Sequence, residues 1–119
     1  MTKEIINDDV VIMENLNTRI GEYNIERYYI GGINEAGEED LYSACGCHIT
    51  ISETSNCKDD HTAINDLLKY FLFLGYDAEA YDDVIMNTAP EIKKSLTIAN
   101  YDSEDVTKDI VKMIKNYFV

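Results

Sequence analysis

Cations are scarce in this sequence. Its 119 residues include only 10 lysines and arginines against 23 aspartates and glutamates, which gives a formal net charge of −13. Proteins gain affinity for DNA and RNA mostly by neutralising phosphates with Lys and Arg, so this balance excludes an ordinary nucleic-acid binder. An acidic surface instead attracts basic partners, among them the positively charged grooves of nucleic-acid enzymes. We therefore expect a basic protein partner and no direct contact with nucleic acid.

Several other features are missing. The chain has no tryptophan and one proline, and no apolar run approaches the roughly 20 residues that span a bilayer. The first residues, Met1 to Glu4, are not followed by the apolar region of a signal peptide. Three cysteines, an odd number, do not make a disulfide framework. These absences predict a cytoplasmic protein with free thiols and no membrane contact.

The composition is that of a globular domain. Hydrophobic residues make up 45% of the chain and charged residues 28%, whereas a disordered acidic segment would lack this apolar content. The length suits one unit that buries its own core without disulfides or a metal. We expect a single α+β domain over residues 1–119.

The first half of the chain has the pattern of strands. Val10 to Met13 is a short apolar run, Arg19 to Ile33 is rich in Ile and Tyr, and Leu41 to Ile51 alternates with period 2. In the last segment Leu41, Ser43, Cys45, Cys47, Ile49 and Ile51 share the expected core face. The polar stretch 34–40 contains Gly37, which suits a hairpin loop. An antiparallel sheet of about three strands is predicted.

The second half has the pattern of helices. Ile64, Leu67, Leu68, Phe71 and Leu74 recur at helical spacing after a cap at Asp59 or Asp60, and Gly75 ends the run. A terminal helix should begin at Asp102 or Ser103. Its core side carries Val106, Ile110, Met113, Ile114 and Tyr117, and its other side Lys108, Lys112 and Lys115. For residues 89–99 both a helix, with Thr88 as cap and Pro90 in its first turn, and a strand through Leu96 and Ile98 remain open. Two or three helices should pack against the sheet.

Cysteine and histidine gather in residues 45–61, where Cys45, Cys47, His48, Cys57 and His61 suggest a zinc site. Alternation along a strand, however, puts Cys45 and Cys47 about 7 Å apart on one face and His48 on the other. We expect no metal and no cofactor, with both of these cysteines buried as structural thiols. No nucleophile, base and orienting group stand at a recognisable spacing, so an enzyme is not expected.

Carboxylates and tyrosines are the candidates for partner binding. The acidic groups do not have the glycine and terminal glutamate of an EF-hand loop, and tyrosine, of which there are nine, is enriched in binding surfaces. The candidate residues are Glu38, Glu39, Asp40, Asp77, Glu79, Asp82, Asp83, Tyr42, Tyr76 and Tyr81.

The first predicted helix is apolar around most of its circumference. Besides its core stripe it carries Tyr70, Leu72 and Phe73. Because such a helix is usually buried on several sides, we expect a homodimer that covers this surface.

A small, acidic, compact chain with many tyrosines and no catalytic motif resembles the anti-defence proteins of phages and mobile elements, notably anti-CRISPR proteins. The resemblance is one of type. Neither Thr18–Tyr23 nor Arg27–Gly32 matches a family motif, so no functional residue is carried over. It implies a bacterial host cell and stoichiometric inhibition of a CRISPR effector or nuclease, with carboxylates where phosphates would bind.

Two alternatives use the same sequence differently. An immunity protein or antitoxin that blocks a toxin nuclease would rely on the same electrostatics. A sponge that sequesters a nucleotide immune signal in a dimer pocket would need a few cations and an aromatic ring, for which the candidates are Arg27, Tyr81, Lys108 and Lys112.

Overall fold

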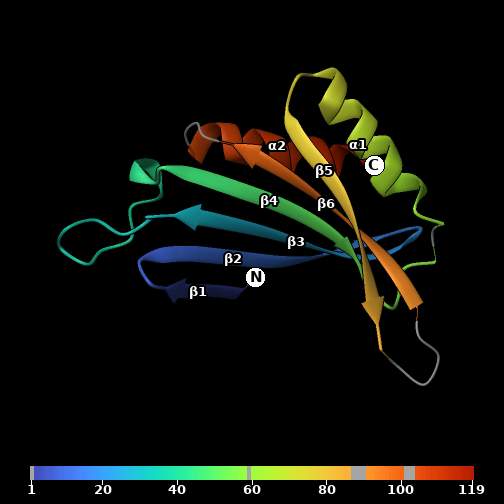
Figure 1. The fold of residues 1–119 in the computed structure, drawn as a ribbon, viewed down its shortest axis with the longest axis horizontal. Coiled ribbons are helices and arrows are strands. Elements are labelled where there is room, and N and C mark those ends of the chain that lie inside the picture. Colours follow the sequence, from blue (N-terminus) through green and yellow to red (C-terminus); the bar gives the residue numbers. More distant parts are fainter. Residues whose placement is uncertain (1, 59, 87–90, 101–103) are drawn as a thin grey trace.

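The computed structural model describes residues 2–58, 60–86, 91–100 and 104–119. They form one six-stranded antiparallel sheet, in the strand order β1-β2-β3-β4-β6-β5, with two α-helices and a short 3-10 turn (Figure 1). In chain order the elements are β1 (Thr2–Ile6), β2 (Asp9–Thr18), β3 (Gly21–Ile30), η1 (Leu41–Ser43), β4 (Gly46–Glu53), α1 (Thr62–Phe73), β5 (Asp77–Ile85), β6 (Glu91–Asn100) and α2 (Glu104–Tyr117).

The predicted fold, an antiparallel sheet of about three N-terminal strands against two or three C-terminal helices, is wrong in the number and placement of its strands. β5 and β6 come from the second half of the chain, and β6 pairs with both β4 and β5. β1 adds a further strand at the start, paired with β2. The helix considered for 89–99 is not formed from Glu91 onward, where the chain is in β6. The cap proposed at Thr88 and the first-turn residue Pro90 lie outside the described residues.

The reason for the strand at β6 is its position beside β4. Leu96 lies opposite Ile51, and Ile98 lies opposite Ile49. All four side chains are buried. Side chains two residues apart share one face of a strand, so β6 buries both Leu96 and Ile98, whereas a helix would turn one of them away.

Three of the sequence predictions are confirmed. β2, β3 and β4 pair antiparallel, and the stretch 34–40 connects β3 to the segment that leads into β4. Cys47, Ile49 and Ile51 face the core as alternation predicts, but the strand expected from Leu41 begins only at Gly46, because Leu41–Ser43 form η1, so Leu41 and Ser43 are not on its core face. The helices α1 and α2 form where expected, although His61, not Asp60, occupies the cap position of α1; Asp59, Asp102 and Ser103 lie outside the described residues.

A buried carboxylate ties the start of α1 to the sheet. Glu53, at the end of β4, is 5% exposed. Its Oε1 accepts hydrogen bonds from Nδ1 of His61 at 2.6 Å and from the backbone N–H of Lys94 on β6 at 2.7 Å. One side chain therefore joins β4, β6 and α1.

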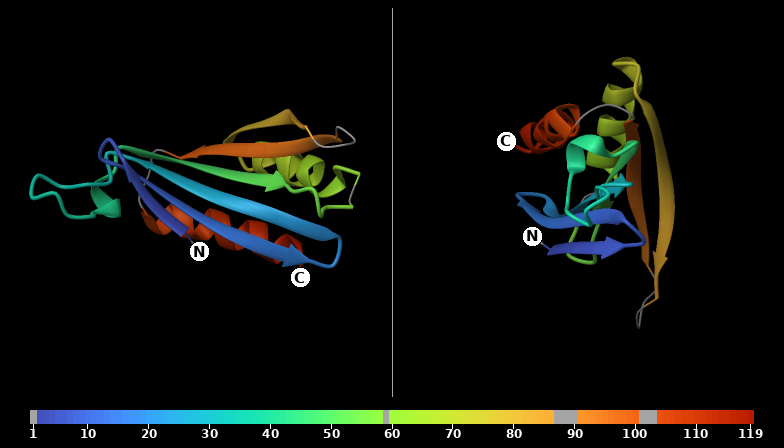
Figure 2. Two further views of the ribbon diagram at one scale, coloured as in Figure 1. Left: turned by 90° about the horizontal axis from the view of Figure 1, so that it is seen from below. Right: turned by 90° about the vertical axis from the view of Figure 1, so that its left-hand side faces the viewer.

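The core lies between the helices and one face of the sheet. α1 packs on β5 and β6, while α2 packs on β4, and both helices lie on the same side of the sheet (Figure 2). Alternate residues of each strand enter this core, among them Val10, Ile12, Tyr23, Ile25, Tyr29, Cys47, Ile49, Ile51, Leu96 and Ile98. We call the opposite side, on which no described helix packs, the open face.

Candidate functional site

The open face has a floor of small polar side chains. The pairing register places Thr50 of β4 beside Thr97 of β6, and Ser52 beside Ser95. The two threonine hydroxyls are 3.0 Å apart, and Ser95 Oγ donates to Ser52 Oγ at 3.0 Å. These hydrogen bonds fix the short side chains that form the floor.

Carboxylates line the β5 side of this floor. Asp77, Glu79 and Asp83 alternate along β5 and are exposed, and Asp83 Oδ2 accepts a hydrogen bond from Ser95 Oγ at 3.0 Å. The Tyr81 hydroxyl donates to Glu79, and this bond raises the pKa of Tyr81. A shallow hollow of about 150 Å³ opens here, lined by His48, Asp77, Glu79, Tyr81, Thr97 and Ala99.

The β3 side of the floor carries Glu26 and Tyr28. Glu26 lies opposite Thr50, and Tyr28 lies opposite His48. The Tyr28 hydroxyl donates to Asp9 Oδ2 at 2.5 Å, and the Gly31 N–H donates to Asp9 Oδ1 at 2.8 Å. Both bonds lower the pKa of Asp9, the tyrosine bond more strongly. Asp9, Glu26 and Tyr28 are not among the residues predicted from sequence, although alternation in β3 puts Glu26 and Tyr28 on one face.

Positive charge is nearly absent from the open face. Within the described strands, Lys93 is the one lysine or arginine that the register places on this side. Its side chain is 11% exposed, because Nζ contacts the Cys57 carbonyl oxygen and Glu91 Oε2, each at 3.0 Å. Asp77, Glu79, Glu26 and their neighbours therefore repel one another in the free protein, and a basic partner would relieve that repulsion.

The predicted cluster Glu38, Glu39 and Asp40 lies elsewhere. It belongs to the loop between β3 and η1, which projects beyond one end of the sheet, away from β5 (Figure 1). Glu39 is paired with Lys3 of β1 at 2.5 Å. The two acidic clusters proposed from sequence do not form one surface.

The remaining candidates also separate. Asp82 turns away from the open face and pairs with Lys94 at 3.5 Å. Tyr42 of η1 is 61% exposed, and its ring centroid is 5.9 Å from Lys108 Nζ on α2. Tyr76 is half-buried, with its ring 5.6 Å from that of Phe71 in the core. Of the ten predicted partner-binding residues, the open face gathers Asp77, Glu79, Asp83 and Tyr81.

The alternative nucleotide set is brought together only in part. Arg27, Lys108 and Lys112 line one groove on the helix side of the sheet. Tyr81 lines the hollow on the open face, so it cannot serve that groove.

The cysteine prediction is half right. Cys47 is buried, but Cys45 is exposed because it precedes β4, which starts at Gly46. Burial raises the pKa of the Cys47 thiol to about 11. Among the residues that the structure describes, no group of three histidines, cysteines or carboxylates is placed to hold a metal ion.

We expect native protein at pH 8 to expose one fast-reacting thiol to dithionitrobenzoate, that of Cys45. Cys57 is buried, and a pKa near 11 leaves only about one Cys47 thiol in a thousand as thiolate at this pH. All three should react in denaturant. Fast reaction of two or three thiols in the folded protein, or no loss of the fast phase in Cys45→Ser, would contradict the observed burial.

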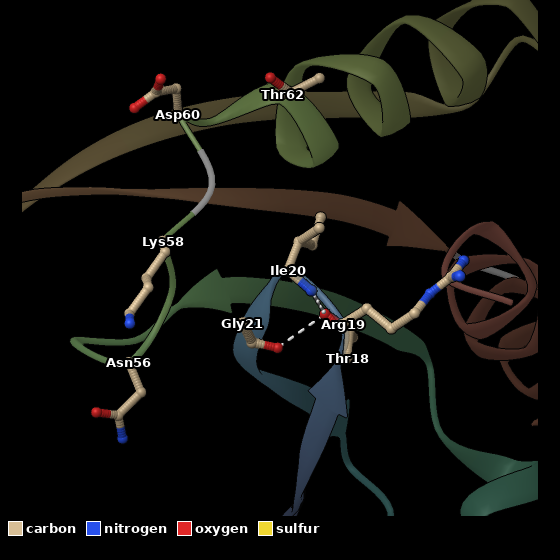
Figure 3. Close-up of a pocket in the computed structure, with 8 residues that line it drawn as sticks. All are labelled: Thr18, Arg19, Ile20, Gly21, Asn56, Lys58, Asp60 and Thr62. Atoms are coloured by element: carbon tan, nitrogen blue, oxygen red, sulfur yellow. Dashed lines mark hydrogen bonds between the residues drawn. The ribbon is translucent and has the colours of Figure 1, made fainter.

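A larger hollow of about 600 Å³ lies between the β2–β3 turn and the segment before α1. Figure 3 shows its lining residues. The side chain of Arg19 points away from Lys58 and Asn56, and the drawn hydrogen bonds join Thr18 Oγ to the Ile20 N–H at 3.2 Å and to the Gly21 carbonyl at 2.8 Å. The charged side chains of Arg19, Lys58 and Asp60 point in different directions in this view.

The C-terminal end of α1 carries apolar side chains that are exposed in the single chain. Phe73 is 87% exposed, Leu72 51% and Tyr70 46%. The homodimer expected from these residues stays a prediction.

We expect Phe73→Glu to shift a self-associating protein to monomers at micromolar concentration, since a buried phenylalanine contributes about 2 kcal/mol to an interface. The fold should be retained because Phe73 makes little contact within the chain. Met86→Glu, which changes an apolar side chain that is 77% exposed just after the end of β5, is the control. Wild-type protein that is monomeric by light scattering at micromolar concentration would remove the basis of the prediction.

Comparisons with protein-family models, curated proteins and solved structures gave no match. Within the described residues, neither helix has the length and apolar character needed to cross a bilayer.

Proposed function

We propose that this protein is a non-enzymatic inhibitor that binds the basic, nucleic-acid-binding surface of a partner protein through its open face. The observation that carries the proposal is the placement of Glu26, Asp77, Glu79 and Asp83 on one sheet face, with Lys93 turned aside to the Cys57 carbonyl. Tyr28 and Tyr81 stand among these carboxylates and supply contact area.

Solvation alone explains only part of this face. Antiparallel sheets commonly leave one face to water, with polar residues on it, and charges on an edge strand such as β5 discourage pairing with other chains. Both solvation of the face and protection of the edge strand could be achieved equally well with positive and negative charges. The predominance of one sign on this face is what favours a basic partner.

The mode of action follows from electrostatics and rigidity. Summed negative potential speeds diffusional encounter with a basic groove, and carboxylates held on hydrogen-bonded strands need little reordering when arginine or lysine side chains bind them. Bound in this way, the open face would occupy the site of nucleic-acid phosphates. The anti-defence proteins that this chain resembles in type would act by such stoichiometric inhibition, on a CRISPR effector or nuclease.

The test begins with immobilised protein and a bacterial lysate, followed by mass spectrometry of captured proteins. The proposal expects a nucleic-acid-binding protein that is captured by the wild type and lost from Glu26→Gln/Asp77→Asn/Glu79→Gln/Asp83→Asn, which we call the open-face variant. Partner identity then separates an immune nuclease from a toxin nuclease. Equal capture by the wild type and the open-face variant would contradict the proposal.

A further inference from the structure

A basic groove runs along α2 on the helix side of the sheet. Lys108, Lys112 and Lys115 follow one another at spacings of four and three residues, which places them on one side of the helix. With Arg27 of β3 and Glu14 of β2 they line a groove of about 280 Å³, and Val111 adds its apolar part. The chain as a whole has a net charge of −13, so four cations in one groove are unusual for this protein.

The cations of the groove are only partly compensated. Lys115 Nζ pairs with Glu14 Oε2 at 2.9 Å, and Arg27 Nη1 lies 3.6 Å from Glu104 Oε1. Lys108 and Lys112 form no ion pair with any residue that the structure describes, and Lys108 Nζ lies 5.9 Å from the centroid of the Tyr42 ring. Within the described part of the chain, two ammonium groups therefore stand without an ion pair beside two paired cations.

The groove also has a fixed part. Arg27 is 13% exposed, and its Nη1 lies 3.4 Å from the Tyr29 hydroxyl as well as close to Glu104. Val111 is 6% exposed. A ligand would meet a held guanidinium and a packed apolar side chain on the inside, and flexible lysines at the rim.

The size and spacing of the cations indicate the kind of anion. Lys108 and Lys115 are seven residues apart, about 10 Å along the helix axis, so linked phosphates reach more of the ammonium groups than one phosphate does. A long polyanion is disfavoured, because outside the groove it would meet the acidic remainder of the surface. A small ligand carries few charges beyond those the groove neutralises.

We propose that the groove formed by Arg27, Lys108, Lys112 and Lys115 binds a small molecule through a diphosphate group. Free pyrophosphate and nucleoside diphosphates share this chemistry. The site lies on the opposite side of the sheet from the open face and is independent of the proposed inhibitor function.

Isothermal titration calorimetry at low salt, with chelator present, tests the proposal with inorganic pyrophosphate and with ADP as separate probes. We expect one site per chain and a dissociation constant below about 1 mM for at least one probe. Lys108→Gln/Lys112→Gln should raise that constant by about tenfold or more, because it removes two charge-assisted contacts. Equal affinities identify the diphosphate as the whole recognised group. Tighter binding of ADP that is lost in Tyr42→Ala identifies a nucleotide site.

Lys58→Gln/Lys69→Gln is the matched control, since it removes the same positive charge from exposed sites outside the groove. The proposal is overturned if neither probe binds, or if both double variants weaken binding equally. The open-face variant should bind the probes as the wild type does. Loss of partner capture with probe binding intact, or the reverse, therefore shows which of the two proposals has failed.

Discussion

Replacing Arg27 with alanine is expected to lower the free energy of unfolding by about 3 kcal/mol, because it would leave the Glu104 carboxylate buried without its cation. The two side chains are 13% and 4% exposed, and Glu104 Oε2 has no hydrogen-bond partner among the described residues. Glu104 opens α2, where the helix dipole favours a negative charge, and this places the expected loss at the lower end for a broken buried pair. Urea unfolding followed by circular dichroism measures it.

Lys115→Ala is the matched control for this prediction. It also removes one cation from the groove and breaks an ion pair, with Glu14, but Lys115 is 43% exposed. An exposed pair contributes less than about 1 kcal/mol. Equal losses for Arg27→Ala and Lys115→Ala would show that burial of the Arg27–Glu104 pair has been misjudged.

The open-face variant is expected to associate with the captured partner about 10- to 100-fold more slowly than the wild type at low salt, because steering by the carboxylates is lost. Added salt should weaken the wild-type complex by screening and should affect the variant less. Each single substitution should have a small effect, since exposed charge pairs contribute little individually. Stopped-flow or surface-binding kinetics across a salt series measures the rates.

The control for the open-face variant is a second quadruple variant that changes the net charge by the same amount on other surfaces. Glu35→Gln/Asp60→Asn/Asp105→Asn/Asp109→Asn neutralises four carboxylates, all exposed and none of them on the open face. Its association rate should stay close to that of the wild type. If this control slows association as much as the open-face variant, net charge and not the open face governs encounter.

The helices and the central strands could be predicted from the sequence because their local pattern agrees with their final packing. Ile64, Leu67 and Phe71 form one stripe of α1, and Cys47, Ile49 and Ile51 alternate in β4. The spacing in α1 fits only a helix, and the alternation in β4 fits only a strand. Such elements are buried where their pattern points, and tertiary contacts do not change their type.

β5 and β6 could not be assigned with the same security. β5 begins by alternating alanine with charged residues, Ala78 and Ala80 among Asp77 and Glu79, and carries the β-branched residues typical of strands only at its end, Val84 and Ile85. In β6 the few apolar residues fit both a helix and a strand. Pairing with β4, a contact distant in sequence, decides between them.

The candidate site was affected by the same uncertainty. Once β5 is a strand, Asp77, Glu79, Tyr81 and Asp83 share one face and Asp82 does not, a division that composition alone cannot make. Tyr81 was grouped with Arg27, Lys108 and Lys112 by chemistry, and the strand places it on the opposite face. Glu26 of β3 cannot be predicted as a site residue from the sequence, because it does not belong to an acidic cluster along the chain.

The most direct test of the central claim is competition between this protein and nucleic acid for the captured partner. Fluorescence anisotropy of labelled DNA or RNA bound to the partner would be followed as wild-type protein, the open-face variant or the charge-matched control is added. We expect stoichiometric displacement by the wild type and the control, and an inhibitory concentration at least about tenfold higher for the open-face variant. Simultaneous binding of nucleic acid and wild-type protein to the partner, or equal displacement by the open-face variant, would contradict inhibition through this face.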